Sequence, residues 1–279
     1  LHSNPMSTPT GRLSTWPMMR SPPALAVSIC CSSSRCSCGR CGYCSTVSVL
    51  AQPALWQFVR VPVLYGGTRD ELRLWVGYAA QAGQPMTQAN YPELLRAVYG
   101  EHAAAVQVRY PALAQGSAAA TLGSVTSDFR PDNGINHCQF VDTAQLLARH
   151  VPVYFMEFAD RQAPVLGVSM PAQPDPGFEL GAVHSAELNY FFPHFSNTTR
   201  MDAPDLLPAS QALSQQLVAT WASFVRTGAP QALGLPAWQR FNEKSQALRF
   251  APGQITPFDP GSAYQCDFWR SLYPAWFGA

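Results

Sequence analysis

A glutamate and a histidine that lie far apart in the sequence each follow an apolar segment. Glu71 comes soon after the run at residues 59–65, and His184 lies in Gly181-Ala-Val-His184. An imidazole takes up protons near neutral pH, and a carboxylate on its other ring nitrogen fixes the tautomer. In one kind of hydrolase triad the chain order is first a serine, then an aspartate or glutamate, and last a histidine. Glu71 and His184 follow the order of the last two members. The chain contains no Gly-x-Ser-x-Gly, so the sequence predicts a base and its orienting carboxylate without the nucleophile.

Two acidic neighbours offer alternative roles at this site. Asp70 precedes Glu71 and is an alternative acid, but adjacent residues point in different directions, so we expect only one of them to face His184, and favour Glu71. Glu187 follows His184 by three residues and resembles a His-x-x-Glu metal pair. No further ligand cluster is evident, which favours a local helical contact and predicts no metal site.

His137 and Cys138 are another pair with chemical potential, because a thiol beside an imidazole can be nucleophilic. Neighbours in sequence rarely point at each other, so a buried cysteine is the favoured interpretation. Asn197-Thr-Thr199 fits an N-glycosylation acceptor, but the pattern is short and we assign it no role.

Apolar runs alternating with helical patterns predict an α/β fold with a parallel sheet, in which loops at the carboxyl ends of the strands carry the chemistry. We expect strands at residues 59–65 and 151–158, an edge strand at 247–250, and helices at 70–78, 91–99, 143–149, 186–192, 210–228 and from 264 onward. Residues 159–180, rich in Pro and Gly, are expected to form a long functional loop.

The helix at residues 210–228 has the clearest pattern in the chain. Its apolar stripe is formed by Leu213, Leu217, Trp221, Phe224 and Val225. Ser210 is the expected N-cap and Gly228 the expected left-handed stop. Trp221 is therefore expected to lie in the core and not to contact a cofactor.

Composition excludes several classes of function. The chain has 279 residues, of which 47% are hydrophobic, and a net charge of +1. That charge is too small to steer a polyanion, so we expect no nucleic-acid partner. No apolar run reaches the roughly 18 residues that a membrane helix needs, so we expect no membrane partner. A chain of this size can bury one large core.

Residues 1–54 differ from the rest and are expected to be disordered or mistranslated, whereas residues 55–279 are expected to form a domain. Six of the eight cysteines lie between Cys30 and Cys44, and the first fifty residues contain no Asp or Glu. The run Cys36-x-Cys38-x-x-Cys41-x-x-Cys44 matches no standard zinc pairing. A secretory segment is a second interpretation, although its apolar stretch is short. The composition favours a third, translation of a GC-rich region in a wrong frame.

Five motifs in order resemble the type B carboxylesterase and cholinesterase family. They are Val61-Pro-Val-Leu-Tyr-Gly-Gly-Thr-Arg-Asp-Glu71, Val151-Pro-Val-Tyr-Phe-Met-Glu-Phe158, Gly181-Ala-Val-His-Ser-Ala-Glu-Leu188, Trp221-Ala-Ser-Phe-Val-Arg-Thr-Gly-Ala-Pro230 with Trp238, and Cys266-Asp-Phe-Trp269. The resemblance covers roughly residues 55–275. It implies the C-terminal half of an α/β-hydrolase fold, with part of its mainly parallel sheet.

The resemblance implies catalytic roles for Glu71 and His184. Glu71 matches the family's triad acid and His184 its general base, acting on a small-molecule carboxylic ester without a cofactor. Leu72 stands where the family has Gly, which adds bulk to the turn. The acyl pocket is expected to draw on aromatic residues, with Trp75, Tyr154, Phe191, Phe192 and Phe195 as candidates.

The family's nucleophile elbow and glycine-rich oxyanion loop have no counterpart in this sequence. The chain is therefore expected to be inactive alone. The alternatives are a non-catalytic esterase-like interaction module and one half of a split enzyme that pairs with a separately made N-terminal half.

Overall fold

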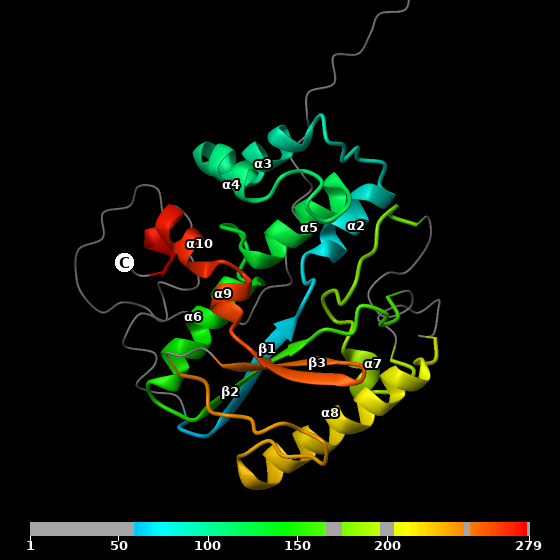
Figure 1. Cartoon of the computed structure of the whole chain (residues 1–279), viewed down its shortest axis with the longest axis vertical. Helices are drawn as coiled ribbons and strands as arrows, with labels where there is room; N and C mark the ends of the chain where they lie inside the picture. The colour runs from blue at the N-terminus through cyan, green and yellow to red at the C-terminus, as the bar shows by residue number, and fades with distance from the viewer. Residues whose placement is uncertain (1–58, 166–174, 196–203, 243–245, 278–279) are drawn as a thin grey trace, which may run out of the picture. The chain divides into compact units, whose positions relative to one another are not determined.

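The computed structural model describes residues 59–165, 175–195, 204–242 and 246–277, which all belong to one unit of the chain, Ser45–Ala279 (Figure 1). The interpretations of residues 1–54, including the cysteine run and the secretory segment, lie outside the described residues. So does the Asn197 sequon. The boundary at residue 55 stays a prediction.

A four-stranded sheet forms the centre of this unit. Its order is β1-β2-β3-β4, and the strands are β1 (Val63–Thr68), β2 (Val153–Phe158), β3 (Ala247–Ala251) and β4 (Gln254–Phe258). The first three strands are parallel and β4 is antiparallel to β3. The sheet is therefore mixed, and the prediction that 247–250 lies at an edge was wrong. Residues 254–258 were missed because their alternation is weak, and they take the edge position that tolerates Pro257.

Strand β1 begins and ends later than predicted, because the two glycines continue the strand instead of ending it. Gly66 has φ +153°, and a Cβ atom there would lie 1.9 Å from the carbonyl oxygen of Met156 on β2. Only glycine allows the two strands to approach so closely. Strand β1 therefore ends at Thr68, and Glu71 lies three residues further along the chain.

The helices are α2 (Arg73–Gln81), α3 (Tyr91–Tyr99), α4 (Ala103–Arg109), α5 (Ala118–Asp128), α6 (His137–Ala148), α7 (Leu188–Phe191), α8 (Pro208–Thr227), α9 (Pro260–Ala263) and α10 (Cys266–Leu272), with 3₁₀ turns η2 (Gly100–His102) and η3 (Pro274–Phe277). The prediction at 91–99 is confirmed. The helix predicted from residue 70 starts at Arg73 and leaves Glu71 on a turn. Helix α6 starts at His137, six residues before the predicted helix, and the side chain of Asn136 caps it. Helix α7 is a single turn.

Helix α8 confirms one of its predicted ends and corrects the other. Gly228 has φ +72° and ends the helix in the left-handed conformation, as predicted. The start is not capped by Ser210, because Pro208 begins the helix one turn earlier. The Ser210 hydroxyl donates instead to Asp160 Oδ2 at 2.5 Å. It therefore joins α8 to the loop that follows β2.

The core lies on both faces of the sheet. Alternate residues of β2 point to opposite sides: Val153 and Phe155 belong to the cluster that includes α3, α5 and α6, whereas Met156 and Phe158 pack with α7 and α8. Figure 1 shows α6 and α8 on opposite sides of the strands. The α/β class is thus confirmed as a sheet covered by helices on both faces.

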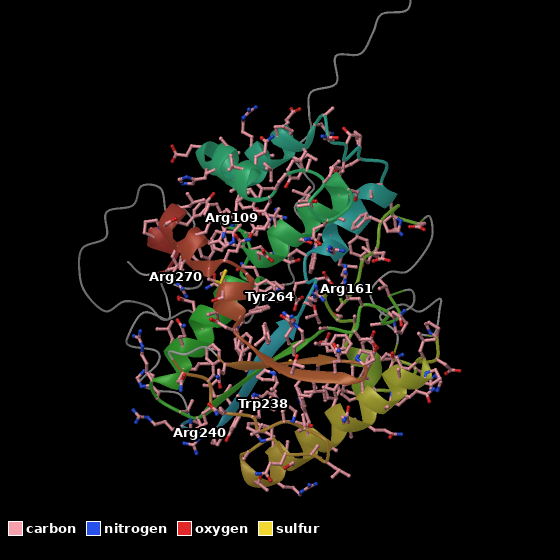
Figure 2. The ribbon with its side chains drawn as sticks, in the orientation of Figure 1. Arg109, Arg161, Trp238, Arg240, Tyr264 and Arg270 are labelled. Atoms are coloured by element: carbon pink, nitrogen blue, oxygen red, sulfur yellow. A yellow bond between two sulfur atoms is a disulfide. The ribbon has the colours of Figure 1, made fainter. Side chains whose placement is uncertain are left out.

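A disulfide between Cys138 and Cys266 joins the first turn of α6 to the start of α10 (Figure 2). Their Cα atoms are 5.2 Å apart, and the bond spans a sequence separation of 128 residues. Cys138 is 0% exposed, so the favoured interpretation of it as a buried cysteine is confirmed. The alternative, a thiol nucleophile beside His137, is wrong because the sulfur is already bonded. Two cysteines so distant in sequence come together only when the chain folds, so their spacing did not indicate the pairing.

Candidate active site

The turn after β1 places Glu71 at the carboxyl end of the sheet. Its Oε1 atom accepts a hydrogen bond from the backbone N–H of Thr68 at 2.7 Å. The carboxylate lies so close to Gly67 that a Cβ atom there would be 2.6 Å from Oε1. Only 4% of the Glu71 side chain is exposed. The glycine and the Thr68 amide together fix where the carboxylate points.

The structure brings Glu71 and His184 together. Glu71 Oε2 and His184 Nδ1 are 2.7 Å apart, and the backbone N–H of His184 donates to the Glu71 carbonyl at 3.3 Å. The ring of Trp75 lies beside the imidazole, with centroids 5.3 Å apart. The His184 side chain is 40% exposed, whereas the carboxylate is covered. One residue of the pair is thus buried and the other reaches toward solvent.

Asp70 does not face His184 but anchors the loop that carries it. Its Oδ2 accepts from the Ala182 N–H at 3.0 Å, and its own N–H donates to the Ala182 carbonyl at 2.8 Å. Arg73 and Arg161 each place Nε 3.3 Å from one of its carboxylate oxygens. Asp70 therefore binds the loop that carries His184, and Glu71 binds His184 itself.

The backbone around His184 is shaped to present the ring. Gly181 has φ +73°, and a Cβ atom there would lie 2.3 Å from Asp70 Oδ2, so glycine is needed for the close approach. Ser185, directly after the histidine, has φ +69°, which costs a non-glycine residue about 1–2 kcal/mol. Such strain is often found where function fixes a side chain.

Electrostatics favour the protonated histidine. Burial lowers the pKa of His184, but the hydrogen bond and charge of Glu71, with the charge of Glu187, outweigh that effect and raise the pKa above its usual value of 6.5. A rise in the pKa of a histidine is expected when a carboxylate stabilises its protonated ring. The ring is consequently a stronger base than an isolated histidine.

Glu187 lies near the pair, and within the part of the chain that the structure describes there is no cluster of three or more metal-ligating side chains. Burial and then the charge of Glu71 raise the pKa of Glu187, although its backbone and His184 oppose the change. Its Oε2 atom is buried without a hydrogen-bond partner in the structure. It acts on His184 through its charge.

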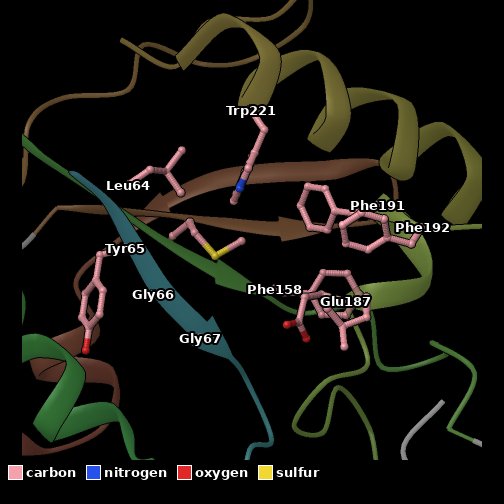
Figure 3. Close-up of a pocket in the computed structure, with 11 residues that line it drawn as sticks. Leu64, Tyr65, Gly66, Gly67, Phe158, Glu187, Phe191, Phe192 and Trp221 are labelled. Carbon is pink, nitrogen blue, oxygen red and sulfur yellow. The ribbon is translucent and has the colours of Figure 1, made fainter. Parts of the chain in front are cut away.

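An apolar recess of about 340 Å³ lies beside β1 and includes Glu187 (Figure 3). Residues of β1 line it together with apolar side chains from β2, α7 and α8, among them Phe191 and Trp221, and Phe192 directly after α7. Two of the five predicted pocket aromatics therefore line it. Tyr154 packs instead on Phe224 and Trp238. Trp221 is half-buried and lines the recess, so it is less deeply placed than predicted.

Leu72, which stands where the resemblance calls for glycine, fits without strain. Its φ of −88° is open to any residue, its side chain is 1% exposed, and its N–H donates to Ser127 Oγ at 2.9 Å. The added bulk fills the core and leaves the turn intact. Sequence reasoning gave no sign of the Ser127 contact, because 55 residues separate the partners.

Replacing Asp70 with alanine is expected to lower the free energy of unfolding by about 3–5 kcal/mol, because Arg73 would be left buried without its ion partner. The Arg73 and Asp70 side chains are only 3% and 7% exposed. Urea unfolding would measure the loss. The matched control is Asp132→Ala, since Asp132 is 64% exposed in its pair with Arg130 and its removal should cost below about 1 kcal/mol. Equal losses in the two variants would contradict the anchoring role of Asp70.

A partly parallel sheet with an acid and a histidine at the carboxyl ends of its strands is the arrangement of an α/β-hydrolase. The sequence model of the carboxylesterase family matches residues 49–269, which is most of the chain. The chain therefore belongs to the carboxylesterase family.

Individual relatives match shorter stretches. Carboxylesterase 3 of Pongo abelii is 33% identical over 104 residues, 36% of this chain and 17% of that protein. Cocaine esterase of Homo sapiens is 25% identical over 138 residues, 48% of this chain and 22% of that protein. Acylcarnitine hydrolase of Mus musculus is 28% identical over 109 residues, 39% of this chain and 18% of that protein. The matches thus span between 17% and 22% of these relatives.

Among the described residues, no helix is both long and apolar enough to cross a bilayer.

Proposed function

We propose that Glu71 and His184 are the acid and the base of a serine carboxylic ester hydrolase, and that sequence outside this chain supplies the nucleophile. The observation that carries the proposal is the 2.7 Å contact between Glu71 Oε2 and His184 Nδ1. Membership of the carboxylesterase family supports an ester as the substrate class. Single histidines seldom carry function, but one that is held by a buried carboxylate at the end of a parallel strand is placed for catalysis.

The chemistry assigns one role to each nitrogen of the ring. Nδ1–H donates to Glu71, which leaves Nε2 to take the proton of a serine hydroxyl as its oxygen attacks the ester carbonyl. The imidazolium then gives that proton to the departing alcohol, leaving an acyl-serine. Water, activated by the same nitrogen, releases the acid and restores the serine. Glu71 stays ionised and stabilises the imidazolium at each step.

The proposal requires two groups that this sequence does not provide in the usual motifs. One is the serine of a Gly-x-Ser-x-Gly turn and the other is a set of oxyanion donors. Each oxyanion donor stabilises the transition state by roughly 3–4 kcal/mol. Without a hydroxyl to deprotonate, the Glu71–His184 pair has no reaction to assist.

The purified chain is expected to release no p-nitrophenol from p-nitrophenyl acetate above the background rate of the buffer. The His184→Ala variant, which lacks the base, should give the same rate and serves as the control. Turnover by the unchanged chain that His184→Ala abolishes would contradict the proposal, because the chain would then contain its own nucleophile.

A second candidate function is one half of an enzyme that is completed by a separately made N-terminal half. The observation that favours it is the position of β1, which among the described residues pairs only with β2 and forms one end of the sheet. An end strand offers its outer edge to a further strand. Phe192, which is 60% exposed, lines the same recess as residues of β1 and would be covered by a partner that extended over that recess.

A further inference from the structure

His137 is a buried histidine that the proposed chemistry does not use. It is the first residue of α6 and is only 2% exposed. Its Nε2 atom lies 2.9 Å from the carbonyl oxygen of Arg69. Since a carbonyl oxygen only accepts hydrogen bonds, the ring carries its proton on Nε2 and donates. The acceptor belongs to the turn that carries Glu71, two residues further on.

That turn is held by contacts from several elements. The Arg69 N–H donates to Phe158 on β2, the Asp70 N–H to Ala182 in the histidine loop, and the Leu72 N–H to Ser127 on α5. His137 supplies the contact from α6. In the next turn of that helix, the ring of Phe140 approaches Gly67 so closely that a Cβ atom at Gly67 would lie 2.4 Å from it. Helix α6 thus contacts the acid turn on both sides of Thr68.

The His137 ring is itself locked in place. It stacks on Tyr264 with centroids 3.6 Å apart and planes 6° from parallel. The Tyr264 hydroxyl donates to Glu157 on β2, and Arg249 on β3 pairs with the same carboxylate at 2.5 Å. The neighbouring Cys138 is bonded to Cys266. The sheet, through Tyr264 (labelled in Figure 2), and the disulfide therefore fix the position of the His137 ring.

We propose that His137 is a positioning residue for the Glu71–His184 pair, acting through its Nε2–H bond to the Arg69 carbonyl. The bond fixes the residue next to Thr68, whose N–H binds one oxygen of Glu71, and so sets the direction of the other oxygen toward His184. The inference concerns the same site as the proposed function. It is tested without esterase turnover, so it can fail while that proposal stands.

The test separates the hydrogen bond of His137 from its stacking. His137→Phe keeps an aromatic ring on Tyr264 and removes the donor, whereas His137→Gln keeps a donor near the position of Nε2 and removes the ring. In the full chain, His137→Phe should lower the pKa of His184, read by NMR titration of the imidazole, because Glu71 is held less firmly against it. His137→Gln should restore the value of the unchanged chain. Glu71, Glu187 and Trp75, which act on or lie beside the His184 ring, stay the same in both variants.

Amide exchange gives a second readout that general destabilisation would not imitate. Losing one hydrogen bond at the turn should speed exchange of the Thr68 amide about tenfold in His137→Phe. The amide of Leu217, buried in α8, should keep its rate. If both amides accelerated together, or if the pKa of His184 and the Thr68 rate were unchanged, the positioning role would be overturned.

If His137→Phe fails to fold, a second comparison uses two amide side chains. His137→Gln reaches the Arg69 carbonyl, whereas His137→Asn is one methylene too short. The proposal predicts a lower pKa of His184 and faster Thr68 exchange in the Asn variant than in the Gln variant. Equal values in the two folded variants would contradict it.

Discussion

Replacing Cys138 and Cys266 with serine is expected to lower the free energy of unfolding by about 4–5 kcal/mol. The disulfide spans 128 residues, and a cross-link that closes so long a loop removes much conformational freedom from the unfolded chain. A loss of this size is comparable with the whole stability of many domains. Urea unfolding of the oxidised chain and of the double variant would measure it.

The control for this prediction is the unchanged chain after reduction, which should unfold at the same urea concentration as the double variant. The reduced form and the serine variant share the open loop, so their stabilities should agree. A double variant as stable as the oxidised chain would show that the Cys138–Cys266 bond does not constrain the unfolded state as proposed.

Adding the N-terminal part of a carboxylesterase that carries Gly-x-Ser-x-Gly is expected to produce esterase activity that depends on His184. Without its base, a serine triad loses about 10⁴- to 10⁶-fold in kcat. His184→Ala should therefore remove nearly all activity of the co-expressed pair, and Glu71→Gln should remove about 10⁴-fold because the ring loses its orienting partner. Hydrolysis of p-nitrophenyl acetate by the purified complex would measure both losses.

His150→Ala is the matched control for the complemented enzyme, since it removes a histidine that follows α6 and precedes β2, away from the Glu71–His184 pair. The complex that carries His150→Ala should be as active as the complex with the unchanged chain. Activity that survives His184→Ala would contradict the role of His184. A complex that forms without any turnover would support the non-catalytic alternative instead.

Local signals in the sequence predicted the elements that depend on local interactions. Helix α3 was predicted with both ends correct because Pro92 marks its start and Gly100 its end. The end of α8 followed from Gly228 in the same way. The start of α8 was wrong because Ser210 bonds to Asp160, a partner 50 residues away. Strand β4 was missed because its place depends on its pairing with β3.

The contact between Glu71 and His184 was expected from their order in the chain and from the family resemblance. The residues that hold the pair in place were not. The division of roles between Asp70 and Glu71 depends on Arg73, Arg161 and Ala182, which no spacing rule connects. His137 was singled out for chemistry with its neighbour Cys138, yet its ring bonds to the acid turn 68 residues earlier. Such long-range contacts exist only once the chain has folded.

The most direct test of the account is an NMR titration of the His184 imidazole in the chain and in its Glu71→Gln variant. The structure predicts that His184 titrates above its usual value of 6.5, because the carboxylate stabilises the protonated ring. Glu71→Gln keeps the size of the side chain and removes the charge, so the pKa of His184 should fall. An unchanged pKa in the variant would mean that Glu71 does not hold His184, and the acid–base pair at the centre of the account would be lost.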